Sequence, residues 1–103
     1  MKLYAVIRTR GSAWQKSLPL EQQRDWDAHA AFMDALVDDG LVLLGGPLEG
    51  TSDVLLITRA DDPGEIERRL QSDPWTTGGL LRTLRIDPWT LRLGKLPGNG
   101  RAR

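Results

Sequence analysis

His29 is the only histidine in the sequence, which makes it the first candidate for acid–base chemistry. A free imidazole titrates near neutral pH, with a pKa of about 6.5. His29 shares one stripe of a predicted helix with Phe32, Met33 and Leu36, which follow at i+3, i+4 and i+7. The imidazole is therefore expected to face the interior. There it acts either as a general acid or base, or as a histidine at the edge of the core satisfied by one hydrogen bond.

A general base also needs a fixed tautomer, which a carboxylate on one ring nitrogen provides. Two aspartates are candidates for this role. Asp25 stands four residues before His29, where side chains on a helix meet directly. Asp73 precedes Pro74 at the end of a second predicted helix, where its oxygens could equally cap a turn. The residues alone leave both partners open.

Four further residues are candidates for a small-molecule site. The backbone of Gly46 and Pro47 could let a ligand approach closely, or it could simply end a strand at a bulge. Of the four tryptophans, only Trp75 is expected to touch a ligand, and the others are expected in the core and a dimer interface. Arg8, at a strand end, either binds a substrate carboxylate or phenolate or is a solvated surface arginine.

Composition narrows the function classes. Fourteen basic and fourteen acidic residues cancel, so no net charge favours nucleic acid or an anionic membrane. Without cysteine and with one histidine, the usual zinc sites cannot form, and we expect neither a metal nor a cofactor. No stretch reaches the roughly 18 apolar residues of a membrane span, and no signal peptide is evident, which favours the cytoplasm. The length predicts one domain, residues 1–94, followed by a flexible tail, residues 95–103.

Hydrophobic periodicity and turn residues predict a β-α-β-β-α-β order. We expect a loop over residues 10–17 that Trp14 holds against the domain. The expected elements are a strand at 2–9, a helix at 19–39 ended by Gly40, a doubly buried strand at 41–48, a hairpin partner at 54–58, a helix from the Asp62 cap to just before Asp73, and a strand at 80–93. This order is typical of an α+β, ferredoxin-like βαββαβ fold, a four-stranded antiparallel sheet with two helices on one face. The uncovered face predicts a homodimer that packs sheet against sheet.

Several short motifs, in their order and spacing, resemble the YCII-related domain family. They are Trp26-Asp27-Ala28-His29, the run from Asp39 to Leu48, Ser72-Asp73-Pro74-Trp75 followed by Gly78-Gly79-Leu80, and Ile86-Asp87-Pro88-Trp89. The resemblance spans roughly residues 2–93 and implies a ferredoxin-like fold that dimerises into an α/β barrel. It also implies a His-Asp pair as the active site, which by position is His29 with Asp73. Members include lyase-type enzymes of chlorinated aromatic breakdown, although the loop containing Trp14 is not a family hallmark.

The residues and the resemblance together predict a small dimeric enzyme that abstracts a proton from, eliminates from or isomerises a small cyclic or enolisable substrate. His29 would be the acid–base group and Asp73 its orienting partner. Trp75 and the Gly46-Pro47 backbone would form the pocket wall. The alternatives are a non-catalytic dimeric metabolite-binding or accessory module and a purely structural dimer.

Overall fold

The predicted order of elements is confirmed in a computed structural model, which describes residues 1–96. All but the first two residues of the expected flexible tail, 95–103, lie outside the described residues. Residues 1–96 form four strands and three α-helices, with one short 3₁₀ turn. Their bounds are β1 Lys2–Arg10, η1 Leu20–Gln22, α1 Trp26–Asp38, β2 Val42–Pro47, β3 Asp53–Ala60, α2 Pro63–Leu70, α3 Pro74–Thr77 and β4 Leu81–Pro88.

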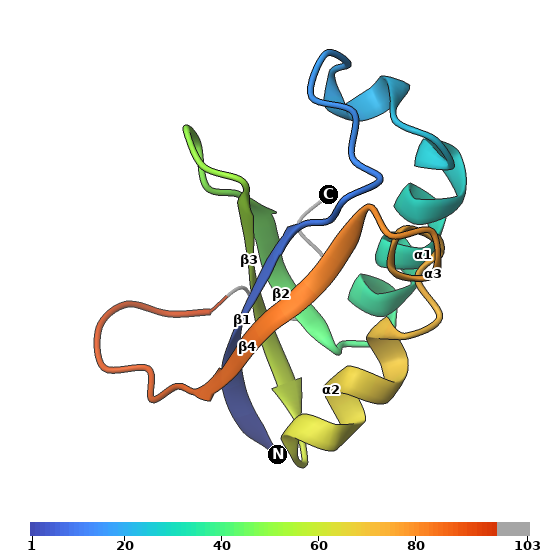
Figure 1. The fold of residues 1–103 in the computed structure, drawn as a ribbon. Coiled ribbons are helices and arrows are strands. Elements are labelled where there is room, and N and C mark those ends of the chain that lie inside the picture. Colours follow the sequence, from blue (N-terminus) through green and yellow to red (C-terminus); the bar gives the residue numbers. More distant parts are fainter. Residues whose placement is uncertain (97–103) are drawn as a thin grey trace.

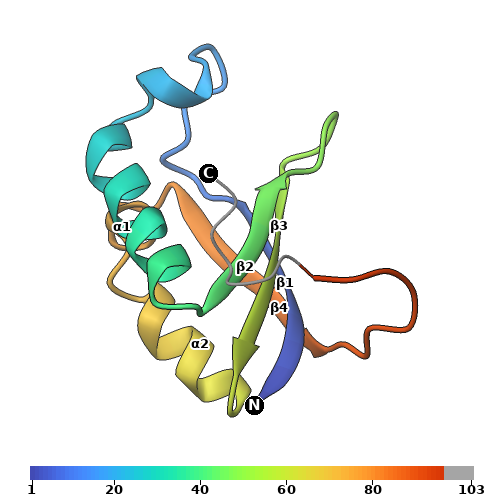
Figure 2. The same cartoon turned by 180° about the vertical axis from the view of Figure 1, so that it is seen from behind.

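The sheet is antiparallel in the order β2-β3-β1-β4, so β1 lies between β3 and β4. The helices lie on one side of this sheet in both views (Figures 1 and 2). The ferredoxin-like α+β architecture predicted from the sequence is therefore confirmed. None of the helices within residues 1–96 combines the length and apolarity that a membrane span requires.

Strand β1 sends alternate side chains to opposite faces of the sheet, as its sequence predicts. Tyr4, Val6 and Arg8 are buried on the face that the helices cover. The main core forms where these side chains meet helix residues such as Leu36 and Ile66. Because Arg8 continues the row of Tyr4 and Val6, the strand carries a guanidinium directly into the protein interior.

The first helix begins later than the sequence predicts, and the physical reason lies in Gln23. Its side-chain amide binds the backbone N–H and carbonyl of Gln15 and the carbonyl of Leu18, which holds Gln23 in an extended conformation. Asp25 then adopts a left-handed conformation, with φ of 61°, before α1 starts at Trp26. The predicted helix over 19–39 is thus wrong in its first third. Its end is correct, since Gly40 takes φ of +85° directly after the helix.

The second helix starts as predicted, with a capping box. The Asp62 side chain accepts a hydrogen bond from the Glu65 N–H, and the Glu65 carboxylate accepts one from the Asp61 N–H. The helix ends at Leu70, before Asp73, also as predicted. The short helix α3 was not predicted, because four residues carry no detectable periodicity.

Two strand predictions are wrong in detail. Strand β4 ends at Pro88 rather than at residue 93, since proline has no N–H to continue the ladder. Strand β2 is not buried on both faces in the single chain, because Leu44 is 45% exposed. Leu44 and Leu48, which is also exposed, border a shallow groove with Leu55 and Ile57.

Candidate active site

The structure brings His29 and Asp73 into direct contact. His29 lies on the first turns of α1, and Asp73 caps α3, so two helices that are distant in the sequence supply the pair. His29 Nδ1 is 2.8 Å from Asp73 Oδ1, and the two side chains are 12% and 0% exposed. Asp25, the other candidate partner, is instead exposed and lies 3.9 Å from Arg24. Of the two aspartates, Asp73 is the one that contacts the imidazole.

Asp73 accepts hydrogen bonds from three donors. Its Oδ1 accepts from His29 and, at 3.0 Å, from the Trp75 N–H, while its Oδ2 accepts from Arg8 at 2.9 Å. Burial raises the pKa of Asp73, but the hydrogen bonds from His29 and Trp75, the positive charge of the imidazole and the bond from Arg8 outweigh burial. The net effect holds the pKa of this carboxyl below its ordinary value, which keeps Asp73 ionised at neutral pH.

An ionised carboxylate can only accept hydrogen bonds, so the contact assigns the proton of a neutral His29 to Nδ1. The other ring nitrogen, Nε2, then carries the basic lone pair. Within residues 1–96 no hydrogen bond is made to Nε2. His29 also lines a mostly apolar pocket, so a ligand there can approach the imidazole.

Arg8 is buried, with 1% of its side chain exposed, so the alternative of a solvated surface arginine is wrong. One terminal nitrogen donates to Asp73, and the other donates to the hydroxyl of Thr76, which itself donates to the Leu70 carbonyl. Burial lowers the pKa of the guanidinium, and the neighbouring Asp73 carboxylate opposes this effect. In the part of the chain that the structure describes, Arg8 Nε is the only fully buried side-chain nitrogen or oxygen without a partner. Arg8 therefore lines the pocket while its terminal nitrogens hold Asp73 and α3.

Trp75 forms the floor beneath His29. The two rings are stacked, with centroids 3.8 Å apart and planes 6° from parallel. The Trp75 indole N–H donates to the Arg24 carbonyl at 2.6 Å, just before α1 begins. This bond fixes the start of α1 relative to α3, and with it the position of His29 relative to Asp73.

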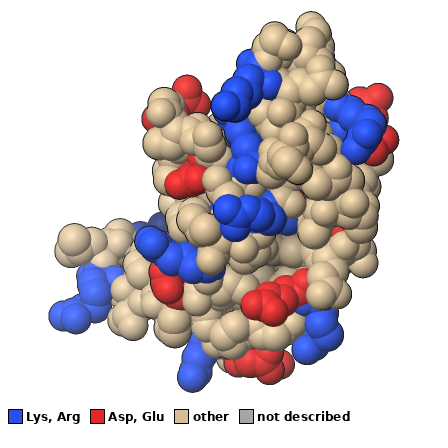
Figure 3. All heavy atoms as spheres, viewed as in Figure 1, with Lys and Arg blue, Asp and Glu red and all other residues tan. Residues whose placement is uncertain are grey.

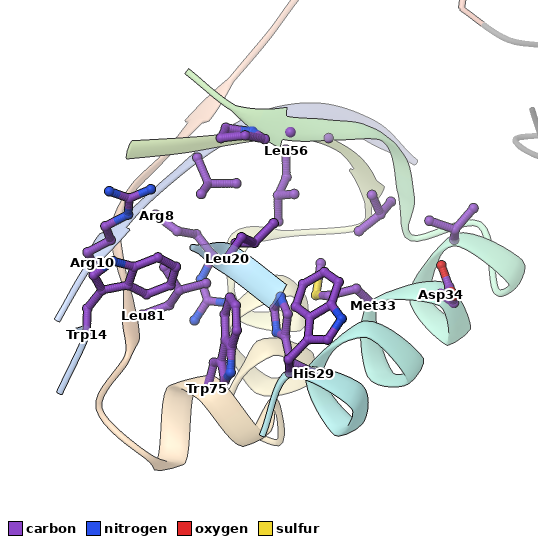
Figure 4. Close-up of a pocket in the computed structure, with 17 residues that line it drawn as sticks. Arg8, Arg10, Trp14, Leu20, His29, Met33, Asp34, Leu56, Trp75 and Leu81 are labelled. Atoms are coloured by element: carbon purple, nitrogen blue, oxygen red, sulfur yellow. The ribbon is translucent and has the colours of Figure 1, made fainter. Parts of the chain in front are cut away.

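The pocket has a cavity volume of about 240 Å³ and lies between the sheet and α1 (Figure 4). Of the predicted site residues, Arg8, His29, Gly46, Pro47 and Trp75 line it, whereas Asp73 lies behind the imidazole. Most of the remaining lining residues are apolar: Trp14, Leu20, Trp26, Met33, Val37, Val42, Val54, Leu56 and Leu81. Such a wall excludes water around the few polar groups, as in most small-molecule sites.

Sequence reasoning missed several residues of this pocket. Trp14 and Trp26 line it beside Trp75, although only Trp75 was expected to touch a ligand. Trp14 meets the Trp75 ring edge-on at 5.3 Å. Arg10 lies over the Trp14 ring, with its guanidinium carbon 4.4 Å from the ring centroid. The alternation of β1 was the available signal for Arg10, because it shares the face of Arg8.

Charged side chains of both signs occur in the chain. Basic and acidic groups are both spread over the face seen in Figure 3. Among residues 1–96, no cluster of three or more His, Cys, Asp or Glu side chains could hold a metal ion. The charged or titratable side chains that line the pocket are Arg8, Arg10, His29 and Asp34, and Asp73 contacts His29.

Comparisons with known proteins show the fold. No family model matches the sequence, and no curated protein matches it. Among solved structures, the chain is similar to 5-chloro-2-hydroxyhydroquinone dehydrochlorinase from Burkholderia phenoliruptrix AC1100, solved in complex with 2,5-dihydroxybenzoquinone. The TM-score is 0.59 at 23% sequence identity, over 85% of this chain and 93% of that chain. The chain thus has the fold of an enzyme that was solved with a small cyclic ligand.

Proposed function

We propose that this chain is a small-molecule enzyme in which His29 acts as the general acid–base group and Asp73 orients it. The observation that carries the proposal is the contact of His29 Nδ1 with the buried Asp73 carboxylate. His29 itself also lines the pocket. This arrangement resembles the base-and-orienter pair found in many enzymes with nucleophilic or acid–base mechanisms. The reaction class is proton abstraction that leads to elimination or isomerisation.

In the proposed reaction, Nε2 of His29 takes a proton from a carbon next to a carbonyl or enol group of the substrate. The electron pair of the broken C–H bond forms a new double bond. In an elimination the leaving group departs with its own electron pair, and in an isomerisation the proton returns to another atom. Asp73 stabilises the imidazolium that forms, and its bonds from Arg8 and Trp75 keep the carboxylate in place.

The pocket favours a small planar substrate. Trp14 and Trp26, which are only partly buried, line it and can pack against a ring. A volume of about 240 Å³ suits one ring with a few substituents. The structural neighbour's hydroxylated quinone is a compound of this size and shape, which supports small hydroxylated rings as the first substrates to examine.

We further propose that the chain is YCII-like and works as a homodimer joined through the open sheet face. The resemblance of the motifs around His29 and Asp73 supports the first part, together with the shared fold. Exposed apolar side chains support the second, since Leu44 and Leu48 are 45% and 38% exposed and border a groove with Leu55 and Ile57. A second copy of the chain would remove them from water.

The function is tested by chloride release from 5-chloro-2-hydroxyhydroquinone, the compound in the neighbour's name. We expect turnover by the wild type and a loss of at least about 100-fold in His29→Gln, because the proton acceptor is removed. Asp73→Asn should lose a similar factor, because no orientation of the amide accepts from all three donors. Asp25→Asn is the matched control and should keep the wild-type rate, since Asp25 makes no side-chain cap bond and lies away from the imidazole.

A wild-type rate in His29→Gln would contradict the proposal. Binding of 2,5-dihydroxybenzoquinone at the tryptophans with no chloride release would instead favour the metabolite-binding module. Tryptophan fluorescence reports that binding, because Trp14, Trp26 and Trp75 all line the pocket.

A further inference from the structure

The mouth of the pocket carries a cation that the proposed acid–base pair does not use. Arg10 is the last residue of β1, it is exposed, and it lines the pocket. Its guanidinium carbon lies 4.4 Å above the Trp14 ring, and Figure 4 shows the two residues together at one end of the pocket. This cation–π contact is not a hydrogen bond, so the Arg10 N–H groups remain able to donate to a ligand.

Arg10 and Arg8 differ in whether their guanidinium N–H groups already have hydrogen-bond partners. The terminal nitrogens of Arg8 already bind Asp73 and Thr76, and moving them would leave a buried carboxylate uncompensated. The Arg10 guanidinium makes neither an ion pair nor a hydrogen bond to any residue within 1–96. Of the two arginines in the pocket wall, Arg10 is therefore the one whose donors a ligand can meet without breaking an existing bond.

Ring contacts connect Arg10 with the imidazole. Arg10 lies over the Trp14 ring, Trp14 meets Trp75 edge-on at 5.3 Å, and Trp75 lies flat against His29 at 3.8 Å. The cation and the base are thus separated by the two indoles that form this side of the pocket. Arg10 and His29 line the same pocket, so one small ring bound there can contact both groups.

We infer that Arg10 is the anion-binding residue of the site, and that the substrate class is a planar ring bearing an anionic oxygen, such as a carboxylate, phenolate or enolate. This inference deepens the proposed function and rests on it for the role of His29. The negative oxygen binds the Arg10 N–H groups. The reacting carbon of the ring then faces Nε2 of His29.

The test compares benzoate with benzamide, which have the same ring and nearly the same shape but differ in charge. Dissociation constants are measured by NMR titration of the tryptophan indole N–H signals. We expect the wild type to bind benzoate about tenfold more tightly than benzamide. Arg10→Gln should bring the two ligands to within about twofold, with benzamide little affected. Added salt should weaken benzoate binding in the wild type, because the cation is exposed.

Arg82→Gln is the matched control. It removes the same charge from an exposed position on β4 that does not line this pocket, so the preference for benzoate should persist. The inference is overturned if Arg10→Gln keeps the preference, if it weakens both ligands equally, or if neither ligand shifts the indole signals in the wild type. Failure of the proposed function would give a different result. His29→Gln would then release chloride at the wild-type rate, while the wild type would still bind benzoate more tightly than benzamide.

Discussion

The imidazole of His29 lies flat on the indole of Trp75, with ring centroids 3.8 Å apart and planes 6° from parallel. Trp75 is also the residue whose backbone N–H binds Asp73 Oδ1, the same oxygen that contacts His29. One tryptophan therefore positions both members of the pair, through its ring and through its backbone. Its indole N–H adds a third restraint by binding the Arg24 carbonyl.

Replacing Trp75 by phenylalanine tests this positioning. Trp75→Phe keeps an aromatic ring, but it loses the hydrogen bond to the Arg24 carbonyl from a side chain that is 1% exposed. We expect Trp75→Phe to lower the free energy of unfolding by about 1–3 kcal/mol, measured by urea denaturation. Trp14→Phe is the control, because the Trp14 indole N–H makes no hydrogen bond within residues 1–96. An equal or smaller loss in Trp75→Phe would contradict the role of this bond.

Removing the Arg8 guanidinium from its pair with Asp73 should strongly lower the free energy of unfolding. Both side chains are almost fully buried, so Arg8→Met leaves a carboxylate in the interior with one donor fewer. We expect a loss of about 3–5 kcal/mol in the free energy of unfolding. The matched control is Arg85→Met, which breaks a pair of 2.9 Å between side chains that are 64% and 53% exposed, and should cost less than about 1 kcal/mol. Similar losses in the two variants would show that burial of the Arg8–Asp73 pair does not increase the cost of breaking it.

Stability should fall in acid through Asp73. The folded state holds the pKa of this carboxyl below its ordinary value of 3.8, so the folded protein binds fewer protons than the unfolded chain as the pH falls. The contribution of Asp73 is therefore complete above about pH 4 and is lost as the pH falls through 3.8 toward the folded-state pKa. The measurement is the difference in the free energy of unfolding between wild type and Asp73→Asn, which should shrink toward about pH 3. A difference that stays constant over this range would contradict the assignment.

The open sheet face should hold two chains together. We expect sedimentation to give twice the 11.5 kDa mass of one chain at micromolar concentration. Leu44→Glu places a charge among the exposed apolar side chains of β2 and should yield single chains, because burying an unpaired charge is costly. Ala31→Glu, on the exposed side of α1, should leave the dimer intact. A wild type that sediments only at 11.5 kDa would refute the dimer.

Local signals in the sequence predicted the fold well. The alternation of β1, the Asp62-Pro63-Glu65 start of α2 and the Gly40 end of α1 depend on residues within a few positions of one another. The start of α1 could not be predicted in this way. It depends on the Gln23 side chain, whose bonds to the Gln15 and Leu18 backbone outweigh a helical pattern that begins at Pro19.

The candidate site was predicted only in part, because it too depends on contacts that local sequence patterns do not indicate. His29 and Asp73 were singled out by residue type, helical position and resemblance, yet Asp25 remained an alternative partner until the two helices were placed. The Arg8–Asp73 pair joins residues 65 positions apart, and no local pattern indicates it. Arg10 and Trp14 were missed as pocket residues, because their stacking depends on how a loop without periodicity lies over β1.

The most direct test of the account is the tautomer of neutral His29, read by nitrogen-15 NMR from the protein's only imidazole. We predict a proton on Nδ1, held by Asp73 at 2.8 Å, and an unprotonated Nε2. Asp73→Asn should shift this balance, because an amide nitrogen placed at Oδ1 donates to Nδ1 and moves the proton to Nε2. A wild-type His29 protonated on Nε2 would mean that the pair does not present a basic nitrogen to the pocket, and it would contradict the proposed chemistry.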